Sequence, residues 1–139
     1  MLAARRQYDR DDIAHFLDLL PTERDGVALR HAIEPRHESF REQSFFDLCR
    51  ERDIAIVYSD DDEFPCIDEQ TASFSYARLQ RMREDVETGY PDAELNNFAG
   101  RARNWSSGKR DVFIFMINGA KVRAPKAALA LQKRIAAPA

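Results

Sequence analysis

The stretch Val112–Ile117, "VFIFMI", decides the fold class, because every residue in it is apolar. A strand with one face in water alternates apolar and polar residues, whereas a strand covered on both faces of a parallel sheet is apolar throughout. The stretch therefore predicts a parallel strand that is buried on both faces. A second apolar stretch, "IAIVY" at 54–58, predicts another strand.

Two further strands are predicted on the amino-terminal side of this stretch. One is "VALRHAIEPR", which we expect to be paired near 29–36, and the other is "FSYARL" at 74–79. Helical spacing of apolar residues separates the strands, and strands that alternate with helices are typical of an α/β fold with a parallel sheet. Residues 60–72 have no helical spacing and predict a long loop. We expect one domain over residues 1–139.

Four helices are predicted from capping residues and apolar spacing. One starts after Asp9, one starts at an S-x-x-E signal at Ser39, one ends near Gly108, and the last has Pro125 in its first turn. Their expected apolar faces are, in order, Ile13, Phe16, Leu17 and Leu20; Phe45, Leu48 and Cys49; Leu95, Phe98, Ala99 and Ala102; and Ala128, Leu131 and Ile135.

Composition limits the functional classes. The chain has 139 residues and a formal net charge of −3, which argues against nucleic-acid binding through bulk positive charge but leaves a local basic patch open. No apolar run approaches the roughly 18 residues needed to span a bilayer, so we expect no membrane partner and a cytoplasmic location. The two cysteines, at 49 and 66, have no metal-site spacing, which predicts no metal and no disulfide framework.

The histidines of "HAIEPRH" at 31–37 are also poor metal ligands. His31, Glu34 and His37 have the spacing of a helical ligand set, but Pro35 opposes a helix interior. On a strand, Glu34 faces away from both histidines, and six residues separate the two rings by roughly 20 Å. We therefore expect no metal and no other cofactor.

Several motifs, taken together, resemble a known family. "ALRHAIEPRHESF", "IAIVYSDDDEFP", "TASFSYARLQ", "TGY" and "DVFIFMINGAKVRAPKAALAL" are similar to the C-terminal half of the YecE-like family, domain of unknown function 72, over about residues 9–135. The resemblance implies half of a (β/α)8 barrel, with family strands five to eight and helices on the outer face. Gln80 and Arg81 replace a family His-Gly, and Ile117, Asn118 and Gly119 replace a family Asn-Asn-Asp. The resemblance implies no particular reaction.

The barrel geometry predicts a polar site. Side chains alternate across a strand, so Glu34 and Arg36 should point inward at the carboxyl end of their strand, as should Arg78 on another strand. Active sites of such barrels lie at this end. We expect Glu34 and Asp60 to be catalytic, with Glu34 as general acid or base. The alternative is that Glu34 merely neutralises the arginines and plugs the barrel.

The other expected substrate-binding residues surround this acid. They are Arg36, His37, Arg78, Gln80, Tyr90, Asn118, Lys121 and Arg123. Four of them are Lys or Arg, which favours an anionic ligand. The sequence leaves three functions open: an enzyme acting on a phosphorylated or carboxylated small molecule, a non-catalytic module for a nucleotide or nucleic-acid end, and a truncated inactive relative.

The strand count predicts a partner. Four strands leave the two outer strands, 29–36 and 112–117, without neighbours. We expect a homodimer, or another chain that completes the barrel.

Overall fold

The computed structural model describes residues 1–117 and 119–138. Its helices are α1 (Arg10–Asp18), α2 (Gln43–Glu51), α3 (Asp92–Trp105) and α4 (Ala124–Ala136), with short 3-10 turns η1 (Glu38–Phe40), η2 (Ser107–Lys109) and η3 (Lys121–Arg123). Its strands are β1 (Glu23–Arg24), β2 (Val27–Ala28), β3 (Ala32–Ile33), β4 (Ala55–Ile56), β5 (Tyr58–Asp60), β6 (Phe74–Leu79) and β7 (Asp111–Met116).

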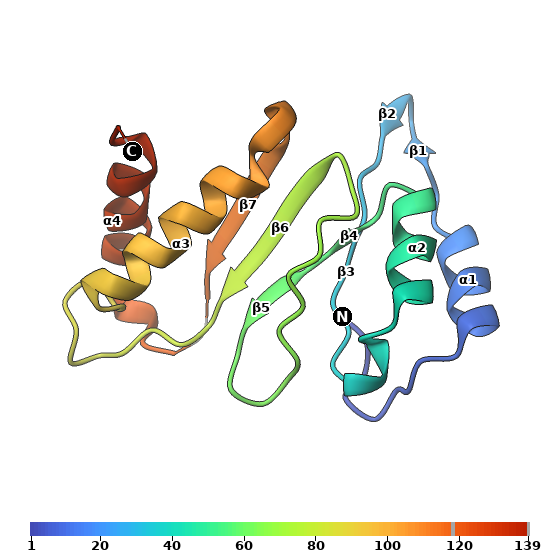
Figure 1. Ribbon diagram of the computed structural model, residues 1–139, viewed down its shortest axis with the longest axis horizontal. Coiled ribbons are helices and arrows are strands. Elements are labelled where there is room, and N and C mark those ends of the chain that lie inside the picture. Colours follow the sequence, from blue (N-terminus) through green and yellow to red (C-terminus); the bar gives the residue numbers. More distant parts are fainter. Residues whose placement is uncertain (118, 139) are drawn as a thin grey trace.

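The strands that form the centre of the molecule are parallel and follow the order of the sequence. β3 pairs with β4, β5 pairs with β6, and β6 pairs with β7. The pairing changes partner at Val57, whose N–H donates to the Ile33 carbonyl at 2.9 Å. The four helices lie over one face of these strands (Figure 1). The chain is therefore a mixed α/β protein with parallel strands, as the apolar stretches predict.

The helix-covered face has two separate cores. One contains Ile13 and Leu17 of α1 with residues of α2, β3 and β4, and the other contains residues of α3 and α4 packed on β5 and β6. In α3 the expected apolar face is confirmed, since Leu95, Phe98, Ala99 and Ala102 are all buried. The Asp9 cap of α1 is confirmed too, because its carboxylate accepts from the Asp12 N–H at 2.9 Å. Each half of the chain thus has a core of its own.

The strand predicted at 29–36 is much shorter than expected. Residues 27 and 28 pair instead with β1 in an antiparallel hairpin, which turns at Asp25 and Gly26. Both turn residues have positive φ, 53° and 77°, the combination that an Asp-Gly turn favours. At the other end Pro35 has no N–H to donate, so only Ala32–Ile33 remains as strand.

The predicted start of the second helix is wrong. α2 begins at Gln43, and Ser39 lies in η1 rather than at the helix cap. The Ser39 hydroxyl accepts from the Tyr8 N–H at 2.8 Å and so ties the amino-terminal segment to η1. In the last helix, Ala127 and Leu131 are buried, whereas the expected Ala128 is exposed.

β7 also differs from the prediction that both of its faces are buried. Its helix-side residues Val112 and Ile114 are only partly buried, and Phe115 on the opposite face is 42% exposed. We call this opposite face, which no helix covers, the inner face. In the described chain the inner face is therefore open. None of the helices in the described ranges is long and apolar enough to cross a membrane.

Candidate functional site

The centre of the candidate site is a buried carboxylate, Glu34, on the inner face. Its side chain is 2% exposed and lies just after β3. Arg78 of β6 donates to Glu34 Oε2, while Arg36 Nε and Nη2 each lie 3.4 Å from Oε1. Strand alternation places Glu34 and Arg36 on one face, and the parallel strands bring Arg78 to the same end. The structure thus brings three of the expected site residues together.

This cluster carries a surplus positive charge. Arg36 and Arg78 are 25% and 16% exposed, and within the described ranges Glu34 is the only carboxylate that pairs with either of them. Arg36 also lies over the Phe64 ring, 4.5 Å from its centre, which fixes the guanidinium against an apolar surface. Two guanidiniums against one carboxylate leave one positive charge to be neutralised.

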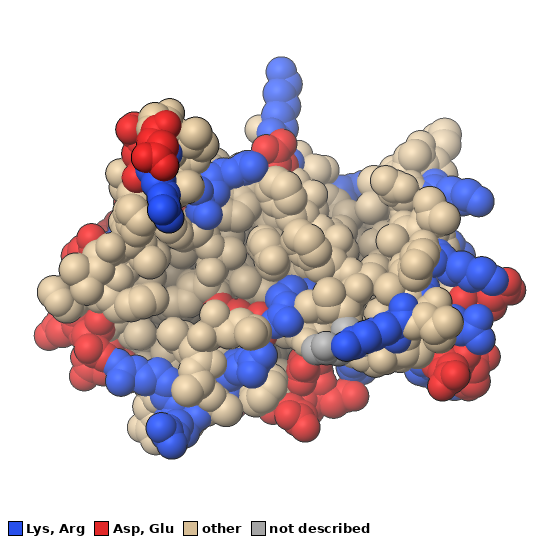
Figure 2. All heavy atoms as spheres, turned by 180° about the vertical axis from the view of Figure 1, so that it is seen from behind, with Lys and Arg blue, Asp and Glu red and all other residues tan. Residues whose placement is uncertain are grey.

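A hollow of about 560 Å³ extends from the cluster along the inner face. Phe74, Tyr76 and Phe113 form an aromatic wall, and Glu34 and Arg78 line the charged end. In Figure 2, which views the molecule from behind, red and blue side chains lie close together near the lower middle, and the area above them is mostly tan. The hollow therefore combines one polar end with an apolar, aromatic wall.

Arg30 lies at the other end of this hollow and was not expected there. Its guanidinium lies 5.1 Å and 4.9 Å from the ring centres of Phe74 and Phe113, and it pairs with Asp111 at 2.9 Å. Strand alternation could have predicted this position, because Arg30 is two residues before Ala32 and four before Glu34, on the same side of an extended chain. Since its charge is paired, Arg30 adds no surplus to the hollow.

Lys121 lines a neighbouring hollow of about 410 Å³ together with Arg78. It is exposed and lies in η3, directly before α4. Arg123 does not join it, because Arg123 Nε donates to the Glu84 carbonyl at 2.9 Å. Asn118 lies outside the described residues. Lys121 therefore shares a hollow with Arg78 of the Glu34 cluster.

Asp60 belongs to a different cluster, on the helix-covered face. Asp60 is two residues after Tyr58 on β5, so the two side chains point to the same face of the strand. The Tyr58 ring packs against Trp105 of α3, which places this face under the helices. Its carboxylate accepts from the Tyr90 hydroxyl at 2.9 Å and from Arg81 Nε at 2.9 Å. The structure therefore separates Asp60 from Glu34 by the thickness of the sheet.

Tyr90 is a core residue rather than the expected rim of the site. It is 1% exposed, and its hydroxyl accepts from the Arg81 N–H at 2.9 Å while donating to Asp60. Burial raises the pKa of the Tyr90 phenol above its usual range, and the bond to Asp60 raises the pKa of the Arg81 guanidinium. The Asp60 cluster is therefore closed by its own partners.

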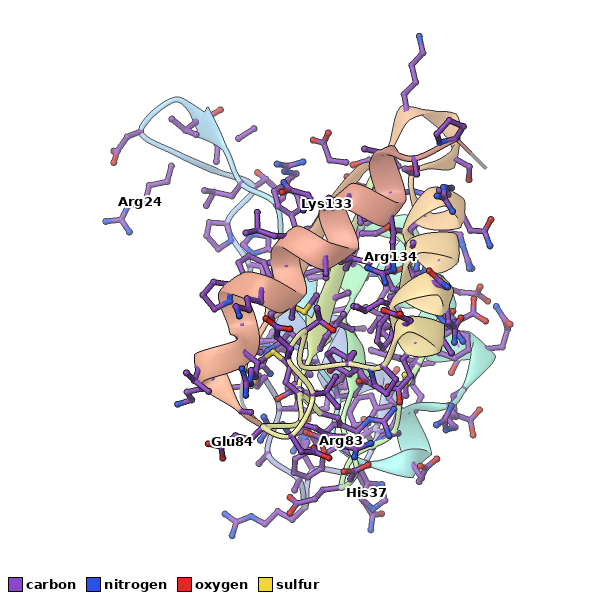
Figure 3. The ribbon with its side chains drawn as sticks, turned by 90° about the vertical axis from the view of Figure 1, so that its left-hand side faces the viewer. Arg24, His37, Arg83, Glu84, Lys133 and Arg134 are labelled. Atoms are coloured by element: carbon purple, nitrogen blue, oxygen red, sulfur yellow. The ribbon has the colours of Figure 1, made fainter. Side chains whose placement is uncertain are left out.

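Two more expected residues make contacts within the protein. Gln80 is buried, and its amide donates to the Ser59 hydroxyl at 2.7 Å. His37 Nδ1 lies 2.8 Å from the Ser39 hydroxyl and also accepts from the Ser39 N–H, so it caps η1. Figure 3 shows His37 at the same end of the molecule as Arg83 and Glu84.

The described residues form neither a cluster of metal ligands nor a reactive thiol site. Throughout the described ranges, no group of three or more His, Cys, Asp and Glu side chains could hold a metal ion. Cys49 is buried in the α2 core, and burial raises the pKa of its thiol to about 12. The site chemistry in the described chain is that of arginine, lysine and one glutamate.

Comparisons with known proteins agree with the family resemblance. The profile of the family described as "Protein of unknown function DUF72" matches residues 2–139. Two solved relatives are DUF72 family proteins from Thermotoga maritima (TM-score 0.73, 20% identity, covering 95% of this chain and 54% of that one) and Enterococcus faecalis (0.71, 16%, 99% and 59%). The chain therefore spans between 54% and 59% of the length of these relatives. No curated protein matches it. The matched range leaves no doubt about its classification: the chain belongs to the DUF72 family.

Proposed function

We propose that the inner-face hollow binds a small phosphorylated or carboxylated organic molecule. The observation that supports this most directly is the buried Glu34 between two guanidiniums, which leaves one positive charge without a carboxylate among the described residues. Both guanidiniums also donate to the Met1 sulfur, at 2.9 Å and 3.0 Å, and a thioether carries no charge to balance them. A guanidinium presents paired donors that match carboxylate and phosphate oxygens. An anion at Arg36 and Arg78 would balance the cluster.

The position of the cluster supports the same proposal. Ligands of parallel α/β sheets bind beyond the carboxyl ends of the strands, where Glu34 and Arg78 lie. Lys121 adds a second cation beside Arg78, before the first turn of α4. As part of this proposal, β3, β4 and β5 taken as one continuous strand, β6 and β7 form the four-strand segment of a (β/α)8 barrel whose interior is the inner face.

The aromatic wall suggests what the rest of the ligand is. The Tyr76 and Phe115 rings stack with centres 5.1 Å apart, and Phe74 and Phe113 continue the same surface. A planar ring attached to the anion would lie against this wall. A nucleotide is the second candidate for this reason, because it joins a phosphate to a planar base.

Isothermal titration with phenyl phosphate and with inorganic phosphate tests the proposal. Arg78→Ala should weaken both by roughly 10- to 100-fold, because it removes a sheltered, charge-assisted contact. Arg83→Ala is the matched control, since Arg83 is exposed and pairs with Asp85 outside the hollow. Phenyl phosphate should bind more tightly than inorganic phosphate if the aromatic wall contributes. Equal binding by wild type and Arg78→Ala, or no binding by either, would contradict the proposal.

The role of Glu34 separates an enzyme from a binding module. If Glu34 only neutralises the arginines, Glu34→Gln should bind phenyl phosphate as tightly as wild type or more tightly. If Glu34 is the general acid or base of a hydrolase, wild type should release phosphate from an aryl phosphate, and Glu34→Gln should lose that turnover while still binding. Binding without turnover in wild type favours the binding module for this class of compound.

A further inference from the structure

The Met1 side chain lies directly on the Glu34 cluster. Its sulfur accepts from Arg36 Nη2 at 2.9 Å and from Arg78 Nη1 at 3.0 Å, so it bridges the two guanidiniums that carry the surplus positive charge. Met1 also lines the inner-face hollow, together with Arg78. The side chain therefore lies where the proposed function places an anion.

The chain that follows Met1 is fixed at two points. The Leu2 N–H donates to the Glu34 carbonyl at 2.9 Å, just beyond β3, and the Leu2 side chain packs on the core of α1, α2 and β3. Figure 1 accordingly shows the N mark near the end of β3. Further along, the Tyr8 N–H donates to the Ser39 hydroxyl at 2.8 Å. These contacts hold the segment against the protein and bring the Met1 side chain to the hollow.

Met1 itself is held much less firmly than Leu2. The residue is 74% exposed. A thioether sulfur is a weak, uncharged acceptor, and the unbranched side chain has three rotatable bonds. A phosphate or carboxylate oxygen accepts from a guanidinium more strongly, because that hydrogen bond joins two opposite charges. An anion should therefore displace the sulfur from both arginines while Leu2 stays in place.

We propose that the Met1 side chain is an autoinhibitory plug of the anion site. In the free protein its sulfur occupies donor groups of Arg36 and Arg78, and an anion binds after the side chain has turned away. This inference rests on the proposed function and adds the regulation of the same site. The apparent affinity for the anion is lowered in proportion to the fraction of molecules in which the plug is out.

Two substitutions at position 1 should change the anion affinity in opposite directions. Met1→Ala removes the plug and should tighten inorganic phosphate binding by about three- to tenfold, the gain expected for a plug that is in place in roughly 70–90% of molecules. Met1→Glu keeps a similar length and brings a carboxylate to the same arginines, so it should weaken phosphate binding by about tenfold or more. Isothermal titration measures both variants and wild type, all made with the same cleavable leader ahead of position 1.

Gln7→Ala is the matched control, because Gln7 is exposed in the same segment and lines a different hollow. It should bind phosphate as wild type does. Phenyl phosphate separates competition for the anion from simple obstruction of the hollow. Met1→Ala should tighten phenyl phosphate and phosphate by the same factor, since the sulfur competes with the anionic group. A gain confined to phenyl phosphate, or a Met1→Glu variant that binds phosphate as tightly as wild type, would overturn the inference.

Methionine methyl NMR observes the displacement directly. In protein with labelled methionine methyl groups, the Met1 signal is identified by its absence from Met1→Ala. Saturating phosphate should move this signal toward the position of an unstructured methionine, while the signal of Met82, which is 4% exposed, stays unchanged. A Met1 signal that does not move while phosphate binds would contradict the plug.

The same titrations separate failure of the plug from failure of the anion site. If wild type and Met1→Ala bind phosphate equally while Arg78→Ala binds it weakly, the anion site is retained and the plug is wrong. If neither wild type nor Met1→Ala binds phosphate, both proposals are wrong.

Discussion

Two buried carboxylates, Glu34 and Asp60, lie at the carboxyl ends of two parallel strands, β3 and β5, and differ in their surroundings. Glu34 lies on the inner face between two arginines, beside an open hollow. Asp60 lies on the helix-covered face, where one arginine and the Tyr90 hydroxyl satisfy it. Both are under 10% exposed, so burial alone does not distinguish a site from a structural ion pair.

What distinguishes them is the balance of charge and the access of solvent. The Asp60 cluster has no surplus positive charge, because its arginine, Arg81, also pairs with Asp62, and its phenol partner is in the core. The Glu34 cluster has one surplus positive charge and faces the inner-face hollow, which is large enough for a small ligand. Four predictions test this contrast, beginning with the largest expected effect.

Removing the charge of Glu34 should have the largest effect on stability. Glu34→Gln leaves two sheltered guanidiniums without a counter-charge, and we expect the free energy of unfolding to fall by about 2–4 kcal/mol. Urea denaturation measures this. Added phosphate should restore part of the loss, because it replaces the missing negative charge. Asp60→Asn is the comparison variant, because it keeps the Tyr90 bond and loses only the half-exposed Arg81 pair. If Glu34→Gln lowers the free energy of unfolding by less than Asp60→Asn does, Glu34 is not the more important of the two buried carboxylates.

Alkaline pH should destabilise the helix-covered side. Burial raises the pKa of the Cys49 thiol from 9.0 to about 12 and raises the pKa of the Tyr58 and Tyr90 phenols. Above pH 9 the unfolded chain therefore holds fewer protons than the folded chain, and unfolding becomes more favourable as pH rises. Cys49 alone should lower the free energy of unfolding by about 1.4 kcal/mol per pH unit in this range.

Urea titrations at several pH values from 8 to 11 measure this loss. Cys49→Ala should be less stable than wild type at pH 8 and should lose less stability between pH 9 and 10. A free energy of unfolding that is constant or rises across this interval would contradict the raised pKa of the buried Cys49 thiol.

Tyr90→Phe should have a smaller effect, confined to the Asp60 cluster. The change leaves Asp60 with one donor fewer and the Arg81 N–H without its acceptor, which should cost about 1–2 kcal/mol. Phenyl phosphate affinity should stay within roughly twofold of wild type, since Tyr90 lies on the other face of the sheet. A marked loss of affinity with little loss of stability would place Tyr90 in the binding site after all.

Lys121→Ala should have the smallest effect. Lys121 is exposed, so its attraction for an anion is screened, and we expect phosphate affinity to fall by about two- to fourfold. The loss should shrink as salt is added. Lys126→Ala is the control, because Lys126 pairs with Glu87 and does not line the Arg78 hollow. An effect as large as that of Arg78→Ala would move the centre of the anion site to η3.

Strand alternation accounts for the part of the site that the sequence could predict. Counting from Glu34 places Arg36 on the same face, and the parallel order brings Arg78 to them. The same alternation along residues 58–60 puts Asp60 on the face of Tyr58. The sequence alone therefore contained a reason not to group Asp60 with Glu34. The dipeptide Asp25-Gly26, directly before the predicted strand segment, is likewise a hairpin signal that the sequence contains.

Other features depend on contacts that no local pattern contains. The Ser39 hydroxyl accepts from Tyr8, 31 residues earlier, which removes it from the helix start that its spacing suggests. Tyr90 is buried because its hydroxyl reaches Asp60, 30 residues away. In both cases tertiary packing decides between two locally acceptable roles.

The change of strand partner at Val57 has a consequence for cooperativity. The amino-terminal and carboxyl-terminal halves each have their own core, so each can open as a separate unit in hydrogen exchange. The Glu34 cluster crosses this boundary, since Glu34 and Arg36 follow β3 and Arg78 belongs to β6. An anion held by both arginines would therefore act as a clasp, so that opening either half requires release of the ligand and the two units unfold as one.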